Sequence, residues 1–224
     1  MGLTKLRKGK CFVGAWKGMC MEMDIEAVIN NLARRNIEAR YFESLDEVER
    51  ELLRIVPISA SVGIGNSQTL KEMCISEKMK ARGNVVFDKT TALSKLASKE
   101  LIRKAIFADW YISGTNAISK EGHIVNIDHT GNRVASIVYG PERVIVVVGV
   151  NKIEDSLPDA IDRARNTAAI QNAKRAGLNP PCVELNKCID CRSKDRVCNN
   201  LVIIEGQVDK ERFKVFIVND DIGF

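Results

Sequence analysis

Apolar residues recur along the chain at two alternating spacings, one typical of helices and one typical of strands. Ile25, Val28 and Leu32 share one face of a predicted amphipathic helix near the start. Compact apolar runs, of which residues 143–148 are the clearest, predict buried strands. The further predicted helices cover residues 45–55, 68–81, 93–108, 131–138 and 156–176. The predicted strands cover residues 39–42, 59–64, 85–88, 110–113, 143–148, 201–205 and 213–218, with a hairpin over 118–127.

This alternation of strands and helices is typical of an α/β fold, with a mainly parallel sheet and helices on both faces. We also expect a small N-terminal helical lobe. No linker or low-complexity stretch divides the chain. We therefore predict an N-terminal segment over residues 1–22 and one α/β domain over residues 23–224, which includes a cysteine-rich loop at 180–200.

Composition narrows the functional class. Hydrophobic residues make up 45% of the chain and the formal net charge is only +5, which excludes a mainly disordered protein. The longest apolar run is far short of the roughly 18 residues that a membrane span needs. The N-terminus has a basic start, but Lys17 and Glu22 interrupt the stretch after it, so it is not a signal peptide and we expect a cytoplasmic protein. Acidic residues are interspersed with basic ones, and we expect neither a nucleic-acid nor a membrane partner.

Three predicted strand ends run into turns rich in glycine, hydroxyl and amide groups, at residues 61–70, 112–118 and 148–152. The carboxyl ends of parallel strands share one edge of a sheet, where ligands bind. Glycine lets backbone N–H groups approach an anion, so we expect a small anionic metabolite here. Ordinary strand–helix turns are the alternative. The binding candidates from these turns are Gly63, Gly65, Asn66, Ser67, Thr69, Gly114, Thr115, Asn116, Gly149, Asn151 and Lys152.

The segment 121–133 is the stretch densest in polar residues and contains both histidines. Its carboxylate, amide and guanidinium groups suit a general acid–base pair or a clamp for an anion. The alternative is a surface hairpin that leads into a helix. The segment adds Asn126, Gly131, Asn132 and Arg133 to the binding candidates, and the catalytic candidates are Asn116, Asn126, Asp128 and Arg133. The chain contains no recognised nucleotide-binding fingerprint.

Four of the seven cysteines fall in one segment, with the spacing Cys182-x5-Cys188-x2-Cys191-x6-Cys198. The segment lacks the apolar periodicity that would explain four thiols as core residues. Cytoplasmic thiols stay reduced, so such a group indicates a metal centre, either a [4Fe–4S] cluster or a zinc ion. The alternatives are a thioredoxin-like pair at the C-x2-C motif and four inert thiols.

Several motifs together resemble the lactate-utilisation (LUD-domain) family. They are VGIGNSQTL, SGTNAISKEGHIVNID, TGNRVASIVYGPERVIVVVGVNKI and the closing DDIGF, and the resemblance extends from about Ile25 to Phe224. The family usually has Gly-Gly-Ser in its first loop, where this chain has Gly65, Asn66 and Ser67. The resemblance implies a fold similar to that of sugar-phosphate isomerases, ribose-5-phosphate isomerases and CoA-transferases.

The same resemblance implies a part in the oxidation of lactate or related hydroxy acids, together with iron–sulfur redox partner proteins. Relatives in the wider group have a catalytic Asp where this chain has Asn116. Because an amide cannot act as a general base, a non-catalytic binding or regulatory module is the second hypothesis. An iron–sulfur redox accessory protein is the third. We also consider a homodimer.

Overall fold

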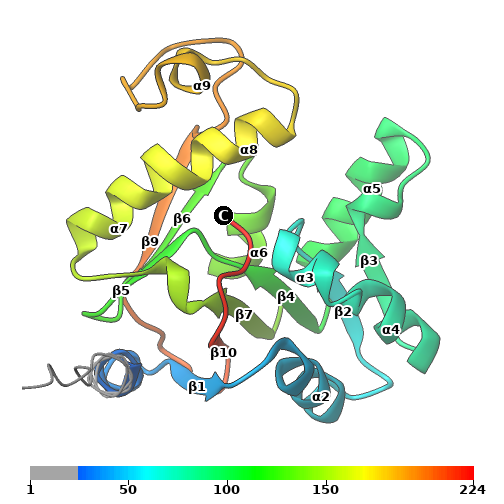
Figure 1. Ribbon diagram of the computed structural model, residues 1–224. Coiled ribbons are helices and arrows are strands. Elements are labelled where there is room, and N and C mark those ends of the chain that lie inside the picture. Colours follow the sequence, from blue (N-terminus) through cyan, green and yellow to red (C-terminus); the bar gives the residue numbers. More distant parts are fainter. Residues whose placement is uncertain (1–24) are drawn as a thin grey trace, which may run out of the picture.

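A six-stranded sheet forms the centre of the protein, whose computed structural model describes residues 25–224 (Figure 1). Its strands are β1 (Glu38–Phe42), β2 (Ser61–Ile64), β3 (Val85–Asp88), β4 (Trp110–Gly114), β7 (Arg143–Gly149) and β10 (Phe213–Val218). They follow the order β1-β10-β7-β4-β2-β3, and every neighbouring pair is parallel. Residues 144–148 of β7 are fully buried, as the central strand of a sheet covered on both faces requires. All six carboxyl ends therefore lie along one edge.

A second, smaller sheet has the order β8-β5-β6-β9. Its strands are β5 (Ala117–Ser119), β6 (Ile124–Asp128), β8 (Ile153–Glu154) and β9 (Asn200–Ile204). The predicted hairpin is confirmed, because β5 and β6 pair antiparallel around Gly122. Gly122 has a φ of +88°, a conformation that favours glycine. Only two residues separate β4 from β5, so the small sheet begins at the carboxyl edge of the large one.

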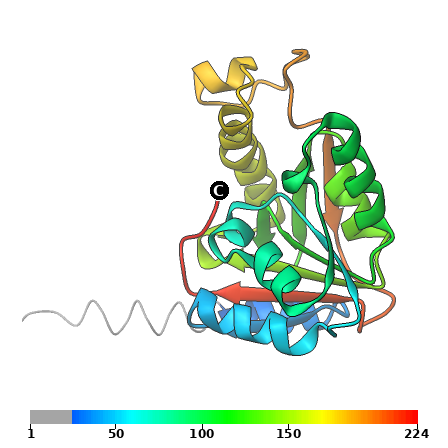
Figure 2. The ribbon, with the colours of Figure 1, turned by 90° about the vertical axis from the view of Figure 1, so that its right-hand side faces the viewer.

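Helices cover both faces of the large sheet, as the sequence predicts (Figures 1 and 2). The helices that flank the large sheet are α2 (Leu45–Ile55), α3 (Gln68–Glu72), α4 (Ile75–Arg82), α5 (Lys95–Ile106) and α6 (Asn132–Val138). Helices α7 (Leu157–Arg163) and α8 (Ala169–Arg175) pack on the smaller sheet, and α9 (Pro181–Leu185) contacts α8. The short segments are η1 (Lys89–Thr91), η2 (Val150–Lys152) and the π-helical η3 (Ala164–Ala168), which joins α7 to α8. Residues 25–33 form a further helix.

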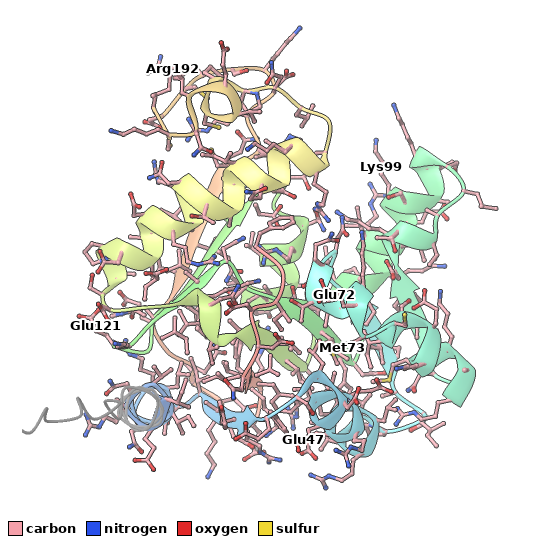
Figure 3. The ribbon with its side chains drawn as sticks, in the orientation of Figure 1. Glu47, Glu72, Met73, Lys99, Glu121 and Arg192 are labelled. Atoms are coloured by element: carbon pink, nitrogen blue, oxygen red, sulfur yellow. The ribbon has the colours of Figure 1, made fainter. Side chains whose placement is uncertain are left out.

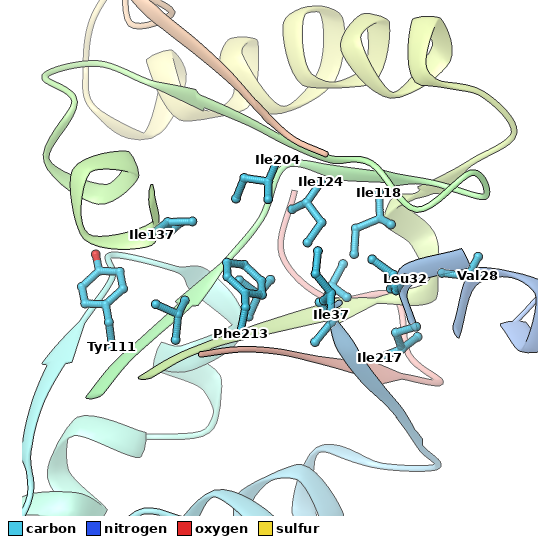
Figure 4. Packing of buried hydrophobic residues seen from close by; sticks show 14 of the residues in the cluster. Val28, Leu32, Ile37, Tyr111, Ile118, Ile124, Ile137, Ile204, Phe213 and Ile217 are labelled. Carbon is cyan, nitrogen blue, oxygen red and sulfur yellow. The ribbon is translucent and has the colours of Figure 1, made fainter. Parts of the chain in front are cut away.

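Three groups of buried apolar side chains hold these layers together. The first joins the helix over 25–33 and the small sheet to the large sheet, and includes Leu32, Ile124 and Phe213 (Figure 4). The second packs α2, α3 and α4 on the opposite face of the large sheet. The third sets a row of alanines from α7, η3 and α8 against Ala117 and Val125 of the small sheet. Small side chains allow this close approach, which brings α8 near the carboxyl edge.

Helix starts follow the capping residues of the sequence. The Ser44 and Ser156 hydroxyls each accept a backbone N–H bond at 3.3 Å at the start of α2 and α7. The prediction of one continuous helix over 68–81 is wrong. Cys74 has a φ of +48°, and this left-handed residue separates α3 from α4. Cysteine has no special preference for that conformation, so nothing in the local sequence indicated the break.

The predicted N-terminal segment over 1–22 lies outside the described residues, as does most of the expected N-terminal lobe. The helix over 25–33 belongs to the first core, because Ile25, Val28 and Leu32 are buried in it. Within residues 25–224, none of the helices combines the length and the apolar character needed to cross a bilayer.

Candidate functional site

A cavity of about 270 Å³ opens at the carboxyl edge of the large sheet. Its walls come from the turns after β2 and β4, the residues after β3, β6 and β7, the inner face of α8, and the end of the chain. The C-terminus ends between α3 and α8 in Figure 1, so the last residues close one side of the cavity. Side chains fill much of the space that the ribbon leaves open there (Figure 3).

The structure brings together most of the polar residues that the sequence singles out. The predicted residues that line the cavity are Asn66, Ser67, Gly114, Thr115, Asn116, Asp128, Asn132, Arg133 and Lys152. The predicted residues that do not line it are Gly63, Gly65, Thr69, Asn126, Gly131, Gly149 and Asn151. The three turns therefore meet at one edge, while several of their glycines face elsewhere.

Arg133, at the start of α6, organises the floor of the cavity. One terminal nitrogen, Nη1, donates to the Gly114 carbonyl and to Asn126 Oδ1, each at 2.8 Å. The other, Nη2, donates to Asn116 Oδ1 at 2.7 Å and to the Ile127 carbonyl at 2.8 Å. These four bonds use all four Nη hydrogens. Arg133 therefore ties β4 to β6, and its outer edge is not available as a fork for a carboxylate.

The two other catalytic candidates on this floor are engaged as well. Asn116 Oδ1 also accepts the Ile127 N–H at 2.8 Å. Asp128 Oδ1 accepts the N–H groups of Thr130 and Gly131, at 3.1 and 2.9 Å, and its Oδ2 lies 3.6 Å from Arg133 Nε. Asn116 thus holds the end of β6 in place, and Asp128 holds the loop that follows it.

Lys152 differs from these residues. It is only 3% exposed and lines the cavity at the end of η2. Among the described residues, no hydrogen-bond or ion-pair acceptor is recorded for its ammonium group. Burial and the nearby Arg163 and Arg133 together lower the pKa of Lys152 to about 8, while Glu72 on α3 (Figure 3) opposes the change.

Two further cations line the same cavity, and the sequence analysis did not single them out. Lys89 directly follows β3 and lines the cavity. Burial lowers the pKa of Lys89, the positive charges of Arg175 and Arg133 lower it as well, and the negative charge of Asp128 raises it. Arg175 lies at the end of α8, donates to Asn66 Oδ1 at 3.1 Å, and stacks its guanidinium over the Phe224 ring at 5.7 Å. Lys89 was predictable from the strand-end rule, whereas nothing local in the sequence marks Arg175.

Several buried polar atoms at this edge lack a partner in the described structure. They are Gln68 Oε1, Thr69 Oγ1, Asn126 Nδ2 and Asn151 Oδ1. Gln68 lines the cavity itself, whereas Thr69 belongs to α3, Asn126 to β6 and Asn151 to η2. An unsatisfied buried polar group costs about 1–3 kcal/mol, so such groups tend to gather where a ligand or ordered water completes them.

The glycines of the turns serve mainly to let segments pack closely. A Cβ on Gly65 would lie 2.5 Å from Ser113 Oγ, and one on Gly114 would lie 2.6 Å from Ser67 Oγ. A Cβ on Gly149 would lie 2.4 Å from the Asp220 carbonyl oxygen, because the C-terminal segment crosses this strand end. Only Gly114 of these three lines the cavity.

The cysteine loop lies at the end of the molecule farthest from α2, beyond α8 (Figures 1 and 2). Cys182, Cys188, Cys191 and Cys198 are free thiols that line one small cavity. Burial raises the pKa of Cys182 and of Cys198, and the neighbouring cysteines raise both further. Among residues 25–224, no three His, Cys, Asp or Glu side chains stand close enough to share a single metal ion.

Comparison with known proteins shows the family and the fold. A family model described as the LUD domain matches residues 25–218. The crystal structure of a DUF162 family protein from Deinococcus radiodurans has a TM-score of 0.51 and 13% identity, with 88% of this chain and 98% of that chain covered. Ribose 5-phosphate isomerase A from Methanocaldococcus jannaschii has a TM-score of 0.35 and 16% identity, with 59% and 66% covered. No curated protein matches the chain.

Proposed function

The chain belongs to the LUD-domain family, and we propose that its cavity binds a small anionic metabolite, such as lactate or a related hydroxy acid. The observation that carries the proposal is Lys152, a buried ammonium that faces the cavity with no acceptor recorded among the described residues. A buried charge is costly unless it is paired. A bound carboxylate or phosphate would supply the missing partner.

The charge balance around the cavity supports the same conclusion. Its lining includes the cationic side chains of Lys89, Arg133, Lys152 and Arg175, whereas, among the described residues, Asp128 provides its only acidic side chain. Asp128 is already bonded to backbone N–H groups and faces Arg133. The lowered pKa values of Lys89, Lys152 and Arg175 include repulsion from neighbouring cations, which an anion would relieve.

The size of the cavity supports a metabolite rather than a large cofactor. Its volume of about 270 Å³ is just below the usual range of roughly 300–1,000 Å³ for sites that hold drug-sized ligands. The Ser67 hydroxyl and the Asn132 side-chain amide lie at its wall and can bind the polar groups of a hydroxy acid, whereas the Thr115 hydroxyl already donates to the Val125 carbonyl. A part in lactate or hydroxy-acid oxidation rests on membership of the family.

The hydrogen bonds of Asn116 favour a second candidate function, that of a non-catalytic binding module. The side-chain oxygen of this residue accepts bonds from both Arg133 and the Ile127 N–H. It therefore has a structural role at the position where relatives in the wider group have an acid. In this alternative the cavity binds the same class of anion and the protein reports its presence.

The proposal is tested by calorimetric titration of L-lactate into wild type and the variant Lys152→Met. We expect affinity to fall by about tenfold or more, equivalent to about 1.4 kcal/mol, because a charge-assisted hydrogen bond is lost. The matched control is Lys174→Met, which removes the same charge from the exposed side of α8. Propane-1,2-diol, which has an alcohol in place of the carboxylate, should not bind. Equal affinity in the two variants would contradict a role for Lys152.

A further inference from the structure

The four cysteines surround a cavity that the proposed function does not use. It measures about 10 Å³ and lies under the loop that follows α8. Every cysteine of the loop contributes to its wall, and none forms a disulfide. Cys182 within α9 and the three cysteines of the loop after it therefore line one cavity.

Specific hydrogen bonds hold the loop in this arrangement. Asp190, inside the C-x2-C motif, has a left-handed φ of +48° that turns the chain sharply between Cys188 and Cys191. The Cys188 N–H donates to Asn166 Oδ1 at 2.6 Å, which fixes the loop to the π-helical segment η3. Arg196 donates to the carbonyl of Cys191 and, at 3.3 Å, to that of Cys198. The positions of the thiols are thus set by the fold.

The space between the sulfurs distinguishes two kinds of thiolate-bound metal. A cavity of about 10 Å³ is roughly the space of one water-sized sphere. Four sulfurs that bind one zinc ion converge to about 2.3 Å from its centre and leave no such space. In a [4Fe–4S] cluster each thiolate binds a different iron atom, so the sulfurs stand farther apart around a larger centre. The cavity is wider than one zinc ion needs, which favours the second arrangement, and the loop would have to widen further to admit a four-iron cluster.

The surroundings also suit a cluster with negative charge. Arg165 and Arg196 line the cavity, and both face Asp190, at 3.9 and 3.0 Å. Ile189 and Val197 add apolar surface, and Val197 is only 2% exposed. Positive charge, hydrogen bonds and limited solvent access are the features by which proteins stabilise and tune iron–sulfur clusters.

We propose that Cys182, Cys188, Cys191 and Cys198 together bind one iron–sulfur cluster. Ala169 of α8 lines both the cysteine cavity and the anion cavity, so the cluster lies across one helix from the bound anion. The proposal rests on the cysteine geometry and does not depend on the proposed function. It assigns to the cysteine loop a ligand that is separate from the anion in the larger cavity.

The test is anaerobic reconstitution of the full chain with ferrous iron and sulfide, followed by analysis of bound iron, acid-labile sulfide and visible absorption. We expect brown protein with about four iron and four sulfide per chain for a [4Fe–4S] cluster. Cys188→Ser and Cys191→Ser should each lose most of the iron. Cys74→Ser is the matched control, because Cys74 is exposed and far from the loop in sequence, and it should bind iron like wild type.

Wild-type protein that takes up no iron and sulfide, or that instead holds one zinc ion and stays colourless, would overturn the proposal. Equal iron in the Cys191 and Cys74 variants would do the same. Circular dichroism separates a lost cluster from a lost fold, and the wild-type iron content decides the question even if a variant unfolds. Lys152→Met should keep its iron while it loses lactate binding, so failure of one proposal can be told from failure of the other.

Discussion

Lys152 connects the stability of the protein to its proposed ligand. In the free protein its ammonium is buried beside Arg133 and Arg163, and these cations and burial together lower its pKa to about 8. A bound anion would provide the opposite charge and raise that pKa again. The residue is therefore costly without the ligand and useful with it, which is typical of binding sites that are formed before the ligand arrives.

The lowered pKa predicts how binding depends on pH. Below about pH 8 the Lys152 ammonium is charged, and above it the amine becomes neutral. The carboxyl of L-lactate stays ionised from about pH 7 to about pH 9, so only the protein titrates in this range. We expect the calorimetric affinity for L-lactate to be constant up to about pH 8 and to fall as pH rises further, by a limiting factor of about ten per pH unit.

The same group makes the stability of the free protein depend on pH. Because the folded-state pKa is lowered from its ordinary value, 10.5, the unfolded chain binds the proton more tightly. The contribution of Lys152 to the free energy of unfolding therefore increases as pH rises from about 8 toward 10.5. A lactate affinity that stays level across pH 8, in wild type as in Lys152→Met, would contradict the assignment of this pKa to the binding group.

At the scale of elements, the C-terminal segment after β10 is the part that closes the site. It crosses the end of β7 so closely that a Cβ on Gly149 would lie 2.4 Å from the Asp220 carbonyl oxygen and 2.7 Å from Ile222 Cγ1. Beyond this crossing, Gly223 and Phe224 line the cavity. The wall of the cavity thus depends on a glycine that does not itself touch the ligand space.

Gly149→Ala should therefore weaken both the fold and the site. We expect the free energy of unfolding, measured by urea denaturation, to fall by roughly 1–3 kcal/mol, and lactate affinity to fall because the segment is displaced. Gly177→Ala is the control, because no atom lies within 4 Å of its added Cβ, although its φ is +66°. That variant should lose about 1 kcal/mol of stability and keep its lactate affinity. A Gly149→Ala protein as stable as wild type would refute this account of the crossing.

The sequence predicted the elements better than it predicted the roles of single residues. Helical periodicity and the capping residues Ser44 and Ser156 were enough to place α2 and α7, because these signals are local. The break at Cys74 was not predictable, since it depends on packing of α3 and α4 against the sheet. The glycines were singled out for contact with an anion, whereas Gly65 and Gly149 fit against Ser113 and Asp220, which come from distant parts of the chain.

For the whole molecule, the parallel order of the strands accounts for the site. β1, β10, β7, β4, β2 and β3 all end at one edge, so polar residues far apart in sequence meet there. Strand ends can be recognised in a sequence, and this is why nine of the 21 residues that line the cavity could be predicted. The contributions of α8 and of the chain end could not be predicted. They depend on tertiary packing, such as that of the helical stretch α7–η3–α8 over the small sheet.

The most direct measurement is an experimental structure of the protein with L-lactate, and separately with inorganic phosphate, at saturating concentration. The account predicts that the anion lies in the cavity at the carboxyl edge, with an oxygen at hydrogen-bond distance, about 2.7–3.2 Å, from Lys152 Nζ. The Arg133 network beneath it should be unchanged. An empty cavity at saturation with both probes, or an anion bound elsewhere while Lys152 remains without a partner, would contradict the central claim.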